Sequence, residues 1–119
     1  MSADADRFLP LKPDVFHLLL ALEEEGPAHG YALLERVERA SLGRVRVAPS
    51  LLYRKLHRLL ADGLVEESEG PTGESDDERR RYYALSLLGR AVLRAEANRI
   101  VGLARSSPVR ALAKAGRRG

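Results

Sequence analysis

The sequence contains no cysteine and no tryptophan, and two phenylalanines and four tyrosines supply all its aromatic rings. The absence of cysteine excludes a disulfide framework and metal sensing through thiolates. No apolar run approaches the roughly 20 residues that a membrane-spanning helix needs. The first six residues are small and acidic, unlike the basic start of a secretory signal. We therefore expect a cytoplasmic protein that does not contact a membrane.

The sequence also has little that would support catalysis or metal binding. Its three histidines, His17, His29 and His57, lie on separate segments without carboxylates at metal-ligand spacing. It has neither a glycine-rich phosphate loop nor a nucleophile elbow. We therefore predict no catalytic residue, no metal and no cofactor, which argues against an enzyme.

Basic residues are concentrated in one segment. Residues 44–60 contain five basic side chains and no acidic one. Leu52, Leu56 and Leu59 recur within it at helical spacing, which predicts a helix over 48–62 with one apolar stripe. The side chains that we expect this helix to offer to DNA are Ser50, Leu51, Tyr53, Arg54, His57 and Arg58. A solvated helix surface could show the same pattern, so the neighbouring segments must decide.

Two short extended segments follow this helix on either side of a loop with glycine and proline. Gly63 is placed to end the helix, and the return segment carries Arg79, Arg80 and Arg81. The pattern predicts a β-hairpin, or wing, over 64–85 whose arginines contact the DNA backbone. Helices predicted over 13–25 and 29–41 complete a winged helix-turn-helix. The fold class is therefore mainly α with a small β-wing, and residues 44–47 could add a third strand.

A further helix is predicted from Ser86 or Leu87 to beyond Leu103. It carries more apolar surface than a small domain needs, arranged in two stripes. One stripe would pack within the chain and the other against a second copy, although both could be buried within one monomer. The residues expected to take part in dimerisation are Leu88, Val92, Leu93, Ala97, Ile100, Leu103 and Ala104.

The predicted domain boundaries follow from these elements. A flexible N-terminus over 1–10 precedes the DNA-binding domain over 11–85, the dimerisation helix over 86–105 and a basic flexible tail over 106–119. Pro108 should end the last helix. Residues 105–119 hold five basic residues and no acid, whereas residues 1–104 have 15 bases and 17 acids. The high overall pI therefore reflects the tail, and the argument for DNA rests on the local charge of 44–60.

Several short motifs resemble the PadR family of bacterial transcriptional regulators in their order and spacing. They are Gly30-Tyr31, Leu52-Tyr53 with Leu56 and Arg58-Leu59, Gly63-Leu64-Val65, and Arg80-Arg81-Tyr82-Tyr83 followed by Leu85 and Gly89. The likeness covers about residues 11–105. Two positions depart from the family pattern: Ser50-Leu51 replaces Gly-Thr, and Ser86-Leu87 replaces Thr-Pro. We expect Ser50 to cap the helix or to contact a phosphate.

The resemblance implies a homodimeric repressor that reads a palindromic operator in double-stranded DNA. It also implies a small-molecule effector near the dimer interface, since relatives respond to phenolic acids or drugs. The alternatives are a winged-helix module that binds protein and a MarR-like regulator. A protein-binding module would usually lose the basic face, and a MarR-like protein would have a longer N-terminus.

Overall fold

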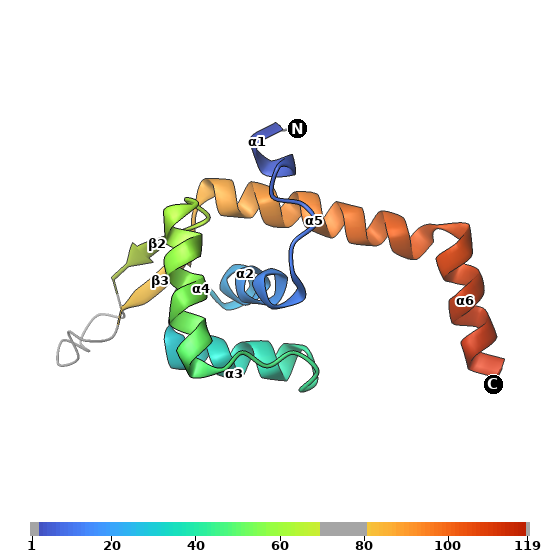
Figure 1. Cartoon of the computed structure of the whole chain (residues 1–119), viewed down its shortest axis with the longest axis horizontal. Coiled ribbons are helices and arrows are strands. Elements are labelled where there is room, and N and C mark those ends of the chain that lie inside the picture. Colours follow the sequence, from blue (N-terminus) through green and yellow to red (C-terminus); the bar gives the residue numbers. More distant parts are fainter. Residues whose placement is uncertain (1–2, 70–80, 119) are drawn as a thin grey trace.

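The structure is a computed structural model that describes residues 3–69 and 81–118. It is mainly helical, with three short strands (Figure 1). In chain order the elements are α1 (Ala3–Asp6), α2 (Pro13–Glu25), β1 (Ala28–His29), α3 (Gly30–Ala40), α4 (Pro49–Ala61), β2 (Val65–Ser68), β3 (Tyr82–Leu85), α5 (Leu87–Arg105) and α6 (Ser107–Arg118). The predicted helices over 13–25, 29–41 and 48–62 and the β-hairpin are confirmed.

Helices α2, α3 and α4 enclose the core. Apolar residues three or four positions apart place a leucine-rich stripe of each helix inside, where burial of these side chains drives folding. The side chains with no exposed surface include Leu18 and Leu19 of α2, Leu33 of α3, and Leu52 and Leu56 of α4. Five residues of α4 with an aromatic, polar or basic side chain, described below, are thereby turned outward.

The three strands form one antiparallel sheet in the order β1-β3-β2. In the hairpin, Val65 lies opposite Leu85, and Ser68 lies opposite Tyr82. The third strand is β1 and not residues 44–47, which form neither helix nor strand, so that prediction was wrong. The ring of His29 meets the ring of Tyr82 edge-on at 5.4 Å between centroids, and its Nδ1 accepts the Ala32 N–H at the start of α3. One residue thus ends β1 and caps α3.

A compact joint fixes the end of α4 to the start of α5. Gly63 takes a positive φ of 78°, and the N–H groups of Gly63 and Leu64 donate back to the carbonyls of Leu60 and Leu59. This is a Schellman motif, which glycine favours because it has no Cβ. The Ser86 hydroxyl donates to the Gly63 carbonyl (2.6 Å) and accepts the Gly89 N–H (2.9 Å). Ser86 is therefore the N-cap of α5.

The N-terminal segment is packed against α5, so the prediction of a flexible end over 1–10 was wrong for residues 3–10. Helix α1 lies on α5 (Figure 1), with Ala5 only 3% exposed. The Leu11 N–H donates to the carboxylate of Glu96, which is 1% exposed and also accepts two hydrogen bonds from Arg99. The attachment of this segment to α5 was not predicted, because residues 1–10 show no apolar periodicity.

The distal part of α5 and helix α6 form an arm. Helix α5 ends at Arg105, Ser106 caps it, and α6 continues at an angle (Figure 1). Pro108 was predicted to end this helix. It lies three residues after the end of α5, which agrees with that prediction. The sequence predicts a flexible tail over 106–119, whereas the structure continues as α6 from Ser107 to Arg118. A proline also fits the first turn of a new helix, where its missing N–H has no partner to lose. Alanines at 111, 113 and 115 favour that helix.

Candidate nucleic-acid interface

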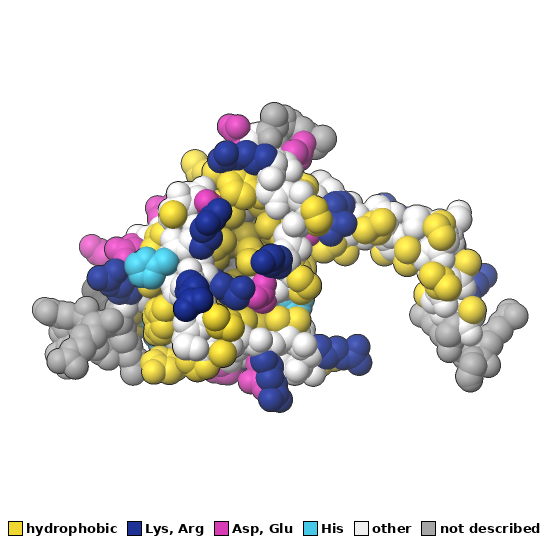
Figure 2. Space-filling model, in the orientation of Figure 1, with side chains coloured by type: hydrophobic (Ala, Val, Ile, Leu, Met, Phe, Trp, Pro, Cys, Tyr) yellow, Lys and Arg dark blue, Asp and Glu magenta, His cyan; other side chains and the backbone are white. Residues whose placement is uncertain are grey.

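Helix α4 divides into a buried side and an exposed side, as its sequence predicts. Leu52, Leu56 and Leu59 are buried in the core. The exposed residues include Pro49 and Ala61 at its ends and all six predicted DNA contacts, Ser50, Leu51, Tyr53, Arg54, His57 and Arg58. Basic and histidine side chains occupy the surface over α4 (Figure 2). The helix thus offers a polar, cationic and aromatic strip of the kind that contacts phosphates and base edges.

The cations of this segment differ in how they are paired. Lys55 turns inward and binds Asp14 of α2, with 2.7 Å from Nζ to Oδ2. Arg58 contacts Asp62 at 3.2 Å, and its side chain is 81% exposed. Arg46 contacts Glu38 at 3.2 Å. Arg44 and Arg54 have no ion pair among the residues that the structure describes, and only Arg54 lies on α4, so its guanidinium is the one on this helix most available to a phosphate or a base.

The Lys55–Asp14 pair connects α4 to the start of α2. Partial burial raises the pKa of Asp14, but hydrogen bonds from Lys55 and the Val15 N–H, with the charges of Lys55 and Lys12, outweigh it. The net effect is a lowered pKa, so Asp14 is ionised at neutral pH. Lys55 is therefore a structural contact as well as a member of the basic segment, which the sequence did not indicate.

The N-terminal end of α4 differs from one prediction. Ala48 is the N-cap and makes no side-chain hydrogen bond, while Pro49 occupies the first helical position. Ser50 is the second helical residue and does not cap the helix. Its exposed hydroxyl still lies beside Leu51, which is 43% exposed. Both residues of the Ser50-Leu51 departure from the family pattern are thus at the surface.

Tyr53 links the two helices of the helix-turn-helix. It is 44% exposed, and a Cβ added to Gly30 would lie 2.8 Å from its hydroxyl oxygen. Gly30 therefore allows the tyrosine ring to approach the start of α3. The neighbouring Tyr31 is 66% exposed. The motif residues Gly30 and Tyr53 thus form one contact, which spacing alone could not show.

Only part of the predicted wing surface lies among the described residues. Arg79 and Arg80 are outside them. Arg81 precedes β3, and its exposed side chain pairs with Glu67 of β2 at 3.1 Å. A DNA phosphate would therefore compete with Glu67 for Arg81.

The predicted dimerisation residues fall into two groups. Val92 and Leu93 are buried in the chain's own core and Leu88 packs against it, so as placed they offer no surface to a partner. Ala97, Ile100, Leu103 and Ala104 are exposed. Val101, Val109 and Leu112, which the sequence analysis did not single out, are exposed beside them. Burial thus divides these residues along the helix axis, and each of the two predicted stripes is covered in its first part and exposed in its last part.

Among the described residues, no group of three or more His, Asp or Glu side chains could hold a metal ion. His57 is exposed on α4, and His29 caps α3. His17 packs beside Phe16, and its buried Nδ1 has no hydrogen-bond partner. Within the same part of the chain, no helix combines the length and apolar character needed to cross a membrane.

The model of the transcriptional regulator PadR-like family matches residues 18–95, which is more than half of the chain and includes α3, α4, the hairpin and the proximal half of α5. The chain belongs to the PadR-like family. This PadR-like protein is therefore a winged-helix transcriptional regulator, which is a DNA-binding class. No curated protein sequence matches it.

Solved structures agree with this fold. A complex of RosR from H. salinarum superposes with a TM-score of 0.66 at 24% identity, covering 95% of this chain and 89% of that one. A PadR family transcriptional regulator from Eggerthella lenta gives 0.56 at 24% identity over 82% of both chains. A transcriptional regulator from Clostridium thermocellum gives 0.56 at 22% identity, covering 83% and 86%. The PadR-like protein shares its architecture with all three.

Proposed function

We propose that the protein is a homodimeric repressor that binds specific double-stranded DNA with α4 in the major groove and wing arginines on the backbone. The observation that carries this proposal is the exposed face of α4, where Arg54 stands without an ion pair among the described residues. An unpaired arginine can donate two hydrogen bonds to the edge of a guanine. Ser50, Tyr53 and His57 flank it on the same face.

The arm formed by distal α5 and α6 supports the dimer. Its apolar side chains include Leu103, 49% exposed, and Leu112, 74% exposed, and they continue along both helices (Figure 2). The radius of gyration is 16.3 Å, whereas a compact chain of this length has about 13–14 Å. An extended arm with exposed apolar residues is the expected form of one subunit of a helical dimer.

Such a dimer would present two copies of α4 to one DNA duplex. The operator should then be palindromic, with half-sites about 34 Å apart or a multiple of that spacing. Repression would follow when the bound dimer covers a promoter. An effector near the dimer interface would act by changing the distance between the two α4 helices.

Selection of bound duplexes from a random pool, followed by titration of the selected duplex, tests the proposal. We expect a palindrome to be enriched, and Arg54→Ala to lose about 1–3 kcal/mol of discrimination at one base position. Arg94→Ala is the matched control, since Arg94 is exposed on α5 without an ion pair in the described part of the chain. Absence of any enriched duplex would favour a protein-binding module. Equal discrimination by wild type and Arg54→Ala would rule out the assigned face of α4.

A further inference from the structure

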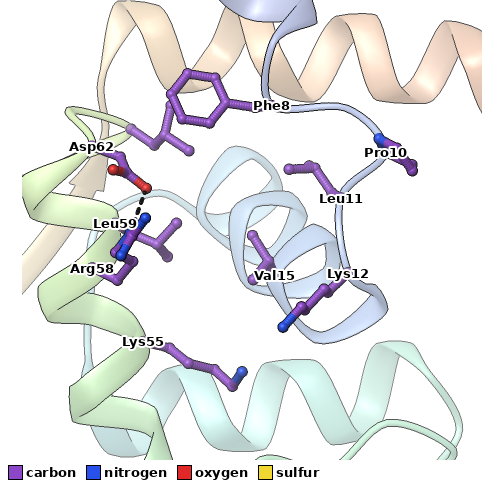
Figure 3. Close-up of a pocket in the computed structure, with 10 residues that line it drawn as sticks. Phe8, Pro10, Leu11, Lys12, Val15, Lys55, Arg58, Leu59 and Asp62 are labelled. Carbon is purple, nitrogen blue, oxygen red and sulfur yellow. Dashed lines mark hydrogen bonds and ion pairs between the residues drawn. The ribbon is translucent and has the colours of Figure 1, made fainter.

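An open cleft lies between the N-terminal segment and the inner flank of α4. Its volume is about 530 Å³, within the range of small-molecule sites. Phe8, Leu11 and Val15 line one side and Leu59 lines the other (Figure 3), and Leu64 also lines the cleft. The cleft is away from the exposed part of α5, so it is separate from an effector site at the dimer interface.

Three cations stand around the mouth of this cleft. Lys12 comes from the start of α2, and Lys55 and Arg58 come from α4 (Figure 3). Lys55 is paired with Asp14 and Arg58 with Asp62, while Lys12 has no ion pair among the residues described. Two carboxylates therefore neutralise two of the three cations, and one positive charge remains unpaired. Lysine and arginine also carry more N–H donors than these pairs use, so an added anion could be held by several of them.

The walls of the cleft narrow the class of ligand. Six of the ten lining residues are apolar, and the other four are charged: Lys12, Lys55, Arg58 and the carboxylate of Asp62, which is paired with Arg58. A ligand with polar groups along its body would place them against the apolar residues without hydrogen-bond partners, which is costly. An alkyl chain would lose nothing and would gain from burial. We propose that this cleft binds a medium-chain alkyl carboxylate, with its head group at Lys12, Lys55 and Arg58 and its chain against the apolar walls.

Binding of a carboxylate in this cleft would also regulate DNA binding. This regulatory effect rests on the proposed function, whereas the binding site itself does not. Lys55 and Arg58 belong to the helix that is proposed to enter the major groove. A carboxylate bound to them would reduce the positive potential that α4 offers to phosphates. Because coupling between two binding sites is reciprocal, DNA and carboxylate should weaken each other's binding.

The first test measures binding of sodium octanoate to the full chain without DNA, by calorimetry and by amide chemical shifts. We expect one site per chain, with the shifts concentrated at Leu11, Val15 and Leu59, and no binding of octylammonium chloride. Lys12→Glu should weaken octanoate about tenfold or more, since it replaces a charge-assisted contact with a repulsive one. Arg44→Glu makes the same charge change outside the cleft and should bind octanoate like wild type.

Several results would overturn the site: no binding of octanoate, equal binding of octylammonium, equal affinity in Lys12→Glu, or shifts confined to Ile100 and Leu103 on the exposed part of α5. None of these depends on DNA, so failure here is distinct from failure of the proposed function. Titration of the selected duplex then tests the regulatory part. Saturating octanoate should weaken binding of wild type at least severalfold, and an unchanged affinity would contradict that part.

Discussion

The two halves of α5 belong to one continuous helix and have similar apolar content, but their surroundings differ. Between Leu87 and Glu96 the helix buries Gly89, Val92 and Leu93 against the domain. Between Ala97 and Arg105 every residue is exposed, and Ile100 and Leu103 are 37% and 49% exposed. The domain and the N-terminal segment cover the first half. Nothing in the described part of the chain covers the second.

This difference separates what the sequence pattern shows from what it leaves open. A helical stripe of apolar residues indicates that a surface is to be buried, but it does not identify what buries it. In α5 the proximal residues stabilise the monomer, whereas the distal ones can gain burial only from another surface. Variants in the two halves should therefore differ in kind: proximal changes should unfold the domain, and distal changes should affect association.

The largest effect is expected at Gly89 in the proximal half. A Cβ at this position would overlap the carbonyl oxygen of Leu64 and lie 3.0 Å from a methyl carbon of Leu85. This carbonyl belongs to the backbone between α4 and the hairpin. The backbone must therefore move to make room for the added methyl group. Gly89→Ala should lower the free energy of unfolding by about 3 kcal/mol or more. Urea denaturation followed by circular dichroism measures this.

Gly102→Ala is the matched control in the distal half. A Cβ there would meet nothing within 4 Å, and alanine favours helix over glycine by up to about 1 kcal/mol. We expect unchanged or increased stability. If Gly102→Ala destabilised the monomer as much as Gly89→Ala, the contrast between the two halves would be wrong.

Glu96 marks the boundary between the halves and should give a smaller effect. Hydrogen bonds from Arg99 lower its pKa, burial opposes them, and the Leu11 N–H adds to the lowering. The folded protein thus binds this proton less tightly than the unfolded chain. The stabilisation is complete above the usual glutamate pKa of about 4.3 and is lost as the pH falls through the lower pKa of the folded state.

Glu96→Gln should cost about 1–2 kcal/mol at pH 7, because Arg99 is partly exposed and the solvent screens the lost ion pair. Urea denaturation from pH 7 to pH 3 should show the difference between wild type and variant shrinking in acid. Glu67→Gln, which removes an exposed pair on the hairpin, should change stability by less. A difference that stayed constant down to pH 3 would show that ionisation of Glu96 does not support the N-terminal attachment.

Helix α4 and the hairpin could be predicted because their signals are local. Leucines at helical spacing, Gly63 after the last turn and the loop between two extended segments each act over a few residues. The exposed face of α4 follows directly from that stripe. The start of α5 at Ser86 or Leu87 was predicted as well, and Ser86 is its N-cap, since a hydroxyl before a helix is a local signal.

The errors lie where contacts join distant parts of the chain. Glu96 holds Leu11 across 85 positions, and β1 pairs with β3, which is more than 50 residues away. Lys55 was counted among the five basic residues of 44–60, and its ion pair with Asp14 of α2 was not predicted. In each case the partner residue is far away in the sequence, and the spacing of apolar residues does not indicate the contact. The helix after Pro108 was missed for another reason: a proline ends one helix and suits the start of the next.

The smallest effect on folding is expected in the distal half, where the combined change Ile100→Gln and Leu103→Gln replaces exposed apolar side chains. The monomer should keep its free energy of unfolding within about 0.5 kcal/mol, because exposed positions contribute little. If the arm holds a dimer, the wild-type unfolding midpoint should rise with protein concentration, and the double variant should lose that dependence. Sedimentation velocity would show the same change as a shift from dimer to monomer.

Leu93→Ala is the proximal counterpart, which should cost about 2–3 kcal/mol in the monomer. A double variant that sediments as a dimer would show that another surface joins the subunits.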